Sequence, residues 1–254
     1  MPYLKIEGIR CFYAGNRSRK GVPVLFCHGS GGSHRHWLYQ LKGLADICNP
    51  VAVDLPGHGR SGGKPSENIS EYADWFYQIS RALDLKSPLI AGHSMGGAVA
   101  LAMGLRYDSS IGGLILLGSG CRLRVLPDFL KNLEEGRAPA EMIDYLYGPD
   151  APEELLEMSR IELEQTDPAV YYADFNACNN FDVTEDLPGI NCPTLIICGS
   201  EDRLTPPKYS HFMKDKIPCS SMQIIPGAGH MVMLEQPGKV NSAIARFVGE
   251  YNKV

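Results

Sequence analysis

The chain reads Gly92-His93-Ser94-Met95-Gly96-Gly97 between an apolar run, residues 87–91, and a run of small and apolar residues, 98–103. This is the pattern G-x-S-x-G in the setting of a strand, a turn and a helix. A serine hydroxyl is a poor nucleophile on an ordinary surface, but a sharp turn of this kind exposes its oxygen to a base. Glycine suits the positions on either side, because side chains there would clash with the neighbouring strand and helix. The pattern therefore predicts a nucleophile at Ser94, close to helical N–H groups that favour a developing oxyanion.

A lone G-x-S-x-G also occurs by chance in turns rich in glycine and serine, so the assignment depends on partners for Ser94. A nucleophilic serine needs a base within hydrogen-bond reach and a carboxylate that orients this base. We assign the base to His230, which follows a predicted strand in a loop containing Gly227 and Gly229. We assign the acid to Asp202, in a loop after another predicted strand, with Glu201 as the neighbouring alternative.

The remaining requirement is a pair of donors for the oxyanion of a tetrahedral intermediate. One donor is expected to be the backbone N–H of Met95, directly after the nucleophile. The other is expected from the loop after the predicted strand 23–27, where we assign the N–H of Ser30, with Gly31 as the alternative. The other interpretation of this loop is a flexible turn, but it does not explain why glycines directly follow a buried strand.

The remaining histidines are expected to play structural or peripheral parts. His28 and His58 lie in tight glycine loops, where we expect them to hold the backbone in place. His93 adjoins Ser94, so we expect its side chain to point away from the nucleophile. Three others are expected at the surface or at the rim of a pocket: His34, His36 and His211.

Length and composition limit the class of protein. With 254 residues, 44% of them hydrophobic and 21% charged, the chain suits one α/β domain or a domain with an insert. The net charge of −5 gives no sign of a nucleic-acid-binding surface, and no apolar run is long enough to span a membrane. Residues 1–7 lack the charged and then apolar regions of a signal peptide, so we expect a cytoplasmic protein.

Cysteine and histidine spacing predicts neither a disulfide framework nor a metal site. None of the eight cysteines forms C-x-x-C, and Cys27 and Cys198 lie in apolar runs typical of buried strands. The seven histidines are not spaced closely with cysteines as metal ligands would be. We therefore expect no cofactor and no metal.

Predicted strands and helices alternate along most of the chain. This indicates a mostly parallel sheet covered by helices on both faces, preceded by an antiparallel pair of strands. The predicted strands are 3–6, 9–14, 23–27, 50–53, 89–91, 113–117, 194–198 and 222–225. The predicted helices are 37–45, 69–85, 95–106, 208–216 and 238–251.

Residues 121–186 differ from the rest of the chain. Strand-like runs disappear, and helical segments are predicted near 127–135, 139–147, 152–165 and 168–179, each with a proline in or near its first turn. The segment carries 16 Asp and Glu against 5 Lys and Arg, whereas the rest of the chain carries 13 against 19. We predict a helical cap, or lid, of residues 121–186 inserted into a core domain of residues 1–120 and 187–254. The alternative is that these helices continue the cover of the sheet.

Taken in order, these motifs resemble the α/β-hydrolase fold superfamily, in the group with a helical cap. The resemblance covers nearly the whole chain and rests on five segments: 28–32, 54–61, 92–97, 199–202 and 229–230. It implies a mostly parallel eight-stranded sheet and the triad Ser94, Asp202 and His230, which appear in the Ser…acid…His order of this architecture. It also implies that residues 54–61 support the site without taking part in the chemistry.

The resemblance leaves several activities open. We expect a serine hydrolase that acts on a small or medium acyl ester. Its expected partner is this small-molecule acyl substrate, with no nucleic acid and no membrane. A carbon–carbon bond hydrolase, a lactonase, an acyltransferase and a small-molecule receptor that retains the triad are the alternatives. Epoxide hydrolases and haloalkane dehalogenases of this fold have an aspartate at the position of Ser94, which disfavours both. The sequence leaves the oligomeric state unknown.

Overall fold

A single eight-stranded sheet runs through the computed structural model, which describes residues 2–15, 20–137 and 140–251. The strands are β1 (Tyr3–Ile6), β2 (Ile9–Gly15), β3 (Pro23–Cys27), β4 (Asn49–Val53), β5 (Leu89–His93), β6 (Gly113–Leu117), β7 (Thr194–Gly199) and β8 (Ser220–Ile225). Their order is β1-β2-β4-β3-β5-β6-β7-β8. Pairs β1–β2 and β2–β4 are antiparallel and all others are parallel, which confirms the predicted sheet.

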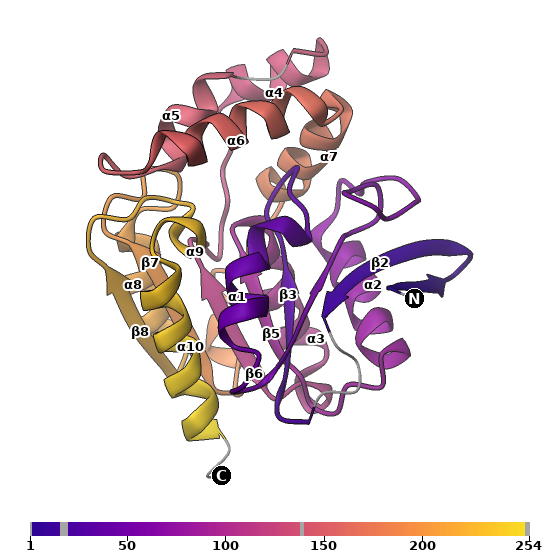
Figure 1. Ribbon diagram of the computed structural model, residues 1–254, viewed down its shortest axis with the longest axis vertical. Helices are drawn as coiled ribbons and strands as arrows, with labels where there is room; N and C mark the ends of the chain where they lie inside the picture. The colour runs from indigo at the N-terminus through magenta and orange to yellow at the C-terminus, as the bar shows by residue number, and fades with distance from the viewer. Residues whose placement is uncertain (1, 16–19, 138–139, 252–254) are drawn as a thin grey trace.

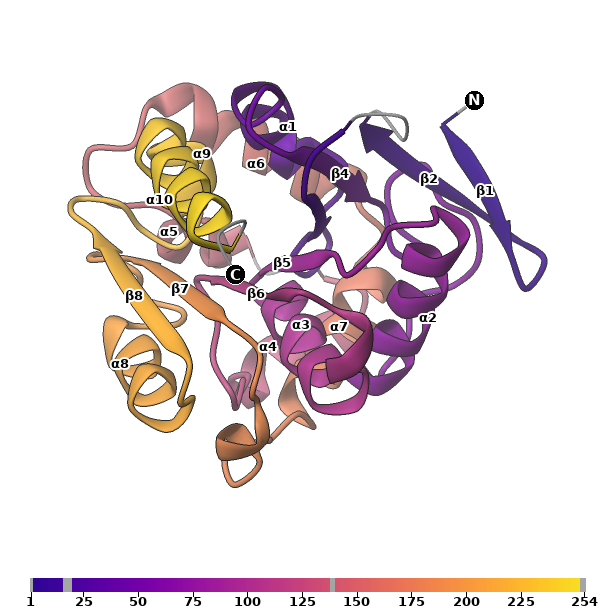
Figure 2. The same ribbon diagram turned by 90° about the horizontal axis from the view of Figure 1, so that it is seen from below.

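Helices cover both faces of the sheet. Figure 2 shows α1 (Leu38–Gly43), α9 (Val232–Glu235) and α10 (Pro237–Tyr251) on one face, and α2 (Ile69–Ala82), α3 (Met95–Arg106) and α8 (Pro207–Lys216) on the other. Each face has its own apolar core. Because both faces are covered, β4 to β7 are buried along their whole length and contain few polar residues. No helix among the described residues is long and apolar enough to cross a membrane.

The predicted helices agree with the structure except near their ends. The helix predicted from residue 37 is a 3-10 turn, His34–Trp37, followed by α1, and sequence analysis missed α9 directly after His230. Helix α2 begins where the Asn68 side chain accepts a hydrogen bond from the N–H of Ser70 (2.8 Å), which satisfies one unpaired helical donor. This start places Tyr72 in the first turn, with its side chain buried under the site loops.

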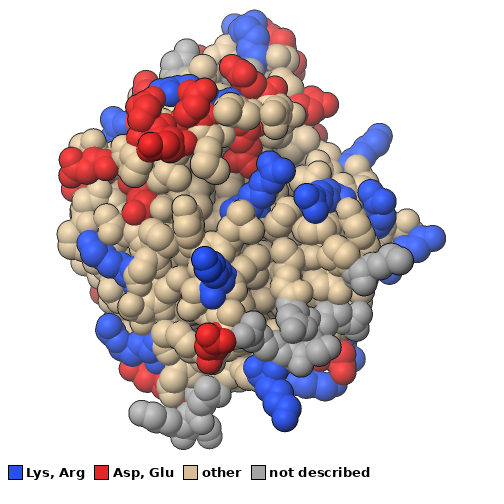
Figure 3. Space-filling view, in the orientation of Figure 1, with Lys and Arg blue, Asp and Glu red and all other residues tan. Residues whose placement is uncertain are grey.

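Four helices lie together above one end of the sheet (Figure 1). They are α4 (Pro127–Glu134), α5 (Ile143–Leu146), α6 (Glu153–Gln165) and α7 (Pro168–Asn179), and a 3-10 turn, Ala140–Met142, precedes α5. Pro139, where one helix was predicted to begin, lies outside the described residues. A small cluster of its own, including Leu133, Ile143 and Leu163, packs between these helices. Acidic side chains gather over them on the face that Figure 3 shows.

Candidate active site

The turn between β5 and α3 is the sharp turn that the sequence predicts. Ser94 has φ 53° and ψ −117°, a backbone conformation that residues other than glycine rarely adopt. Its N–H donates to Leu117 O (3.0 Å). A Cβ on Gly92 would overlap the backbone of Gly96, and a Cβ on Gly96 would overlap the carbonyl of Cys27. Both glycines are therefore required, and the turn presents Ser94 at the N-terminus of α3.

His230 and Asp202 form a hydrogen-bonded pair beside this turn. His230 Nδ1 donates to Asp202 Oδ2 (2.9 Å), and both side chains are buried. Asp202 also accepts hydrogen bonds from the N–H groups of Leu204 (2.9 Å) and Thr205 (2.8 Å) and from the Thr205 hydroxyl (2.8 Å). Burial opposes ionisation of Asp202, but the charge and hydrogen bond of His230 and the Thr205 donors outweigh it, so its pKa lies below the usual range.

Glu201, the alternative acid, points elsewhere. Its side chain is exposed and accepts a hydrogen bond from the Ser200 hydroxyl (2.9 Å). Asp202 is therefore the residue that can orient His230, since it is buried, ionised and bonded to the imidazole. The Nε2 of His230 is left as the nitrogen that can accept a proton.

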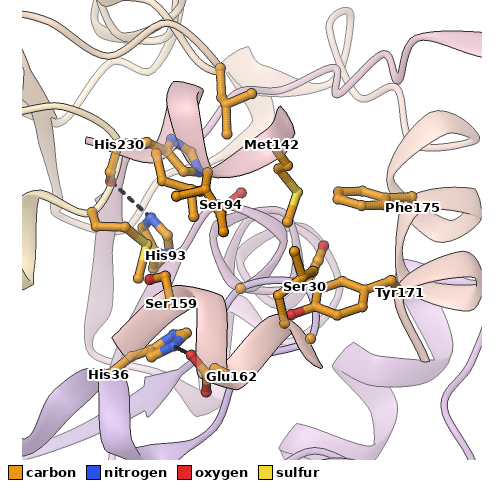
Figure 4. Close-up of a pocket in the computed structure, with 17 residues that line it drawn as sticks. Ser30, His36, His93, Ser94, Met142, Ser159, Glu162, Tyr171, Phe175 and His230 are labelled. Carbon is orange, nitrogen blue, oxygen red and sulfur yellow. Dashed lines mark hydrogen bonds and ion pairs between the residues drawn. The ribbon is translucent and has the colours of Figure 1, made fainter. Parts of the chain in front are cut away.

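Ser94 and His230 line the same cavity. This inner cavity has a volume of about 70 Å³ and lies between the carboxyl ends of the strands and helices α5, α6 and α7. Figure 4 shows His230 and Ser94 next to each other at its wall, with Met142 and Phe175 opposite. The structure thus brings together three sequence-predicted residues that are up to 136 positions apart in the chain: Ser94, Asp202 and His230.

The two expected oxyanion donors also border this site. Met95 begins α3, so its N–H has no acceptor within the helix, and Ser30 lines the same cavity as Ser94. The alternative assignment of Gly31 as the donor is wrong, because its N–H already donates to the Asp174 carboxylate (2.8 Å). The N–H groups of Ser30 and Met95 therefore remain as the candidate pair.

Asp174 is a site residue that sequence analysis missed. It lies on α7, its carboxylate is fully buried, and it accepts hydrogen bonds from Gly31 N–H, from His58 Nε2 (2.8 Å) and from the Tyr72 hydroxyl (2.7 Å). Another α7 residue, Tyr171, packs against Gly31, where a Cβ would overlap its ring. Helix α7 therefore holds the loop that carries the Ser30 N–H. The only sequence signal was an acidic residue within the otherwise apolar segment 169–175.

His28 and His58 hold backbone, as expected, but their surroundings shift their pKa values in opposite directions. His28 donates from Nδ1 to Gly29 O (2.8 Å) and accepts from Leu55 N–H (3.1 Å), and burial lowers its pKa to about 4. His58 donates from Nδ1 to Pro56 O (2.9 Å) and from Nε2 to Asp174. Burial works against the charged form of His58, but the Asp174 carboxylate outweighs it and raises its pKa.

Two other histidines make contacts that sequence analysis did not predict. The His93 ring lines the inner cavity, packs 4.6 Å from the His230 ring and donates from Nε2 to the His230 carbonyl (3.0 Å). Burial, reinforced by His230, lowers the pKa of His93 well below its usual range. His34 lines a neighbouring cavity, as predicted, and it is also a buried partner of Asp54 (2.9 Å). His36 lines the inner cavity, and His211 is exposed, as predicted.

We expect Asp174→Asn to destabilise the protein by about 3–5 kcal/mol, because it leaves a buried imidazolium at His58 without its counterion. Below pH 6.5, the ordinary pKa, His58 is protonated in both states and the pair contributes fully. The contribution declines as the pH rises through the raised pKa of folded His58. Urea unfolding at a series of pH values measures both effects.

Asp182→Asn is the matched control for this variant. Asp182 forms ion pairs with Arg122 (3.4 Å) and Arg124 (3.7 Å), but all three side chains are more than a third exposed. We therefore expect a change within about 1 kcal/mol. Equal destabilisation by the two substitutions would contradict a buried charge pair at Asp174.

A second cavity meets the inner cavity at Ser94. This outer cavity has a volume of about 290 Å³. The two cavities share five wall residues: Ser30, Ser94, Met142, Phe175 and Leu204. Its lining is largely apolar and aromatic but includes Arg124 and Arg203. A substrate held at Ser94 can therefore extend in two directions. The described residues include no group of three His, Cys, Asp or Glu side chains placed to hold a metal ion.

A family model described as "Alpha/beta hydrolase family" matches residues 24–243. The chain belongs to the alpha/beta hydrolase family. A solved structure of a thermophilic esterase resembles this alpha/beta hydrolase with a TM-score of 0.85 and 34% identity, over 98% of the chain and 97% of that structure. The family assignment agrees with the sheet order and with the turn at Ser94.

Two curated relatives carry different activities in their names. The 3-oxoadipate enol-lactonase 1 of Acinetobacter baylyi is 27% identical, over 92% of the chain and 91% of that protein. The dihydrolipoyllysine-residue acetyltransferase component of the acetoin cleaving system of Pseudomonas putida is also 27% identical, over 91% of the chain. This alpha/beta hydrolase spans 64% of the length of that second protein.

Proposed function

We propose that the protein is a serine esterase that hydrolyses carboxylic esters of small or medium acyl groups. The observation that carries this proposal is the pairing of a strained nucleophile turn, in which Ser94 faces a cavity, with a buried His–Asp pair at the same cavity. Ser94 stands at φ 53° at the start of α3, and His230 Nδ1 donates to Asp202 at 2.9 Å. The similarity to an esterase at 34% identity supports an enzyme that acts on esters.

In the proposed reaction, His230 Nε2 takes the proton of Ser94 while Oγ attacks the ester carbonyl. The carbonyl oxygen becomes an oxyanion, which the N–H groups of Ser30 and Met95 stabilise. The imidazolium then gives its proton to the leaving alcohol, and an acyl-enzyme remains on Ser94. Water, deprotonated by His230, releases the acid. Asp202 keeps the proton on Nδ1 and stabilises the charged imidazole.

Hydrolysis of a series of p-nitrophenyl esters with increasing acyl length tests this function. We expect sustained release of p-nitrophenol, fastest for a short or medium acyl chain, because two cavities of about 70 and 290 Å³ meet at the nucleophile. A burst of one equivalent without turnover would instead indicate a receptor or a transferase without its acceptor. Absence of release at every length would contradict an esterase.

A further inference from the structure

The inner cavity carries a carboxylate that the proposed reaction does not use. Glu162, on α6, lines this cavity together with His36 and Ser159 (Figure 4). His36 Nε2 donates to Glu162 Oε2 (2.7 Å), and His36 is only 9% exposed. The described residues supply no hydrogen-bond donor to the other oxygen, Oε1.

Glu162 is charged in this position. Burial opposes its ionisation, but the neighbouring His36 outweighs this effect and lowers the pKa of the carboxyl group. The hydrogen bond from His36 also fixes the orientation of the carboxylate against the wall. A fixed, ionised carboxylate in a small cavity attracts hydrogen-bond donors and repels anions at short range.

The two cavities at Ser94 present different charged groups, although the Glu162 side chain is 30% exposed and also lines a neighbouring cavity with Arg35 and Arg60. The lining of the inner cavity contains no lysine or arginine among the described residues, and Glu162 is the acidic residue that it presents. The outer cavity instead contains Arg124 and Arg203, and the guanidinium of Arg203 lies 4.9 Å from the centre of the Tyr145 ring. A substrate that fills both cavities meets the carboxylate of Glu162, paired with His36, at one end and guanidinium groups at the other.

We propose that Glu162 is a specificity-determining residue of the inner cavity. It favours a substrate group that is neutral or donates a hydrogen bond, such as a hydroxyl, and it rejects a group that ends in a carboxylate. His36 is the positioning residue that holds Glu162. This inference rests on the proposed esterase function, because it concerns the ester half that occupies the inner cavity.

The test compares the hydrolysis of neutral and anionic esters of matched size. The rate is measured from the protons released at constant pH. One pair varies the acyl half, methyl butanoate against monomethyl succinate. The other varies the alcohol half, propyl acetate against carboxymethyl acetate, with 2-hydroxyethyl acetate as the donor-bearing ester. Only the pair that varies the ester half held in the inner cavity meets Glu162. For that pair, the kcat/KM of the wild type should be higher for the neutral ester, and Glu162→Gln should lower this preference by roughly tenfold or more. The glutamine still accepts the hydrogen bond from His36.

Glu164→Gln is the matched control, since Glu164 is exposed on the same helix and loses the same charge. We expect its preference to stay within about twofold of the wild type. The preference of the wild type should also persist in about 0.5 M NaCl, which screens the diffuse field of the fully exposed acidic residues more than a direct contact inside the cavity.

Two failures of this test are distinguishable. Hydrolysis that depends on Ser94, with a preference unmoved by Glu162→Gln in both pairs, overturns this inference alone. No Ser94-dependent hydrolysis of any neutral ester overturns the proposed function. A melting temperature close to that of the wild type establishes that the variant folds. If it does not fold, Glu162→Asp, which withdraws the carboxylate by one methylene, should lower the preference in the same direction.

Discussion

Ser94→Ala should reduce kcat for ester hydrolysis by on the order of 10⁵–10⁶, the largest effect expected of any substitution in this protein. Alanine removes the attacking oxygen but adds no atom to the turn. It also faces the same backbone strain as serine at φ 53°, so the fold should be retained. Steady-state release of p-nitrophenol measures the loss, and circular dichroism measures the fold.

Ser242→Ala serves as the control for nonspecific cleavage by a surface serine. Ser242 is exposed on α10 and bonds only to the carbonyl of Gly238 (2.8 Å) among the described residues. We expect its kcat to equal that of the wild type. A loss of less than about a hundredfold in Ser94→Ala would contradict a nucleophilic role, because binding and the oxyanion donors alone leave only a small residual rate.

Asp202→Asn should lower kcat by roughly 10⁴ with little change in KM. Its carboxylate accepts hydrogen bonds from Leu204 N–H, Thr205 N–H and His230 Nδ1–H. An asparagine oxygen can serve the two backbone donors, which turns its NH₂ group toward Nδ1. The imidazole must then carry its proton on Nε2 and cannot accept the proton of Ser94.

Glu201→Gln is the matched control for this variant, since it removes the same charge one residue away at an exposed position. We expect kcat within about twofold of the wild type. Equal losses in the two variants would show that net charge, rather than the tautomer of His230, sets the rate. The rate of Asp202→Asn should stay low across the pH range in which the wild type is active.

Local patterns were enough to predict the residues that follow strands. Ser94, Asp202 and His230 each lie in a loop directly after a predicted strand, and parallel strands bring such loops to one edge of a sheet. The element order and the eight strands followed from the same alternation of apolar runs and helices. These features depend on periodicity and turn chemistry, which a single sequence carries.

Residues that act through tertiary contacts were not predicted. In the sequence, Asp174 and Glu162 do not differ from the other acidic residues among the 16 in residues 121–186. Their neighbours in the chain do not indicate that Asp174 binds Gly31 N–H or that Glu162 binds His36. The contact of His93 was missed for the same reason. Its neighbour in the chain is Ser94, but its contact is the backbone of His230, 137 positions away.

The most direct test is to label the protein with a p-nitrophenyl alkylphosphonate, whose phosphonyl group mimics the tetrahedral intermediate and is not released by water. Tryptic digestion and mass spectrometry then locate the adduct, and peptide 87–106 contains only two serines, Ser87 and Ser94. We predict one phosphonyl group per chain on Ser94, with esterase activity lost in proportion to labelling. An adduct on Ser87 or elsewhere, or full activity after labelling of Ser94, would contradict the proposed mechanism.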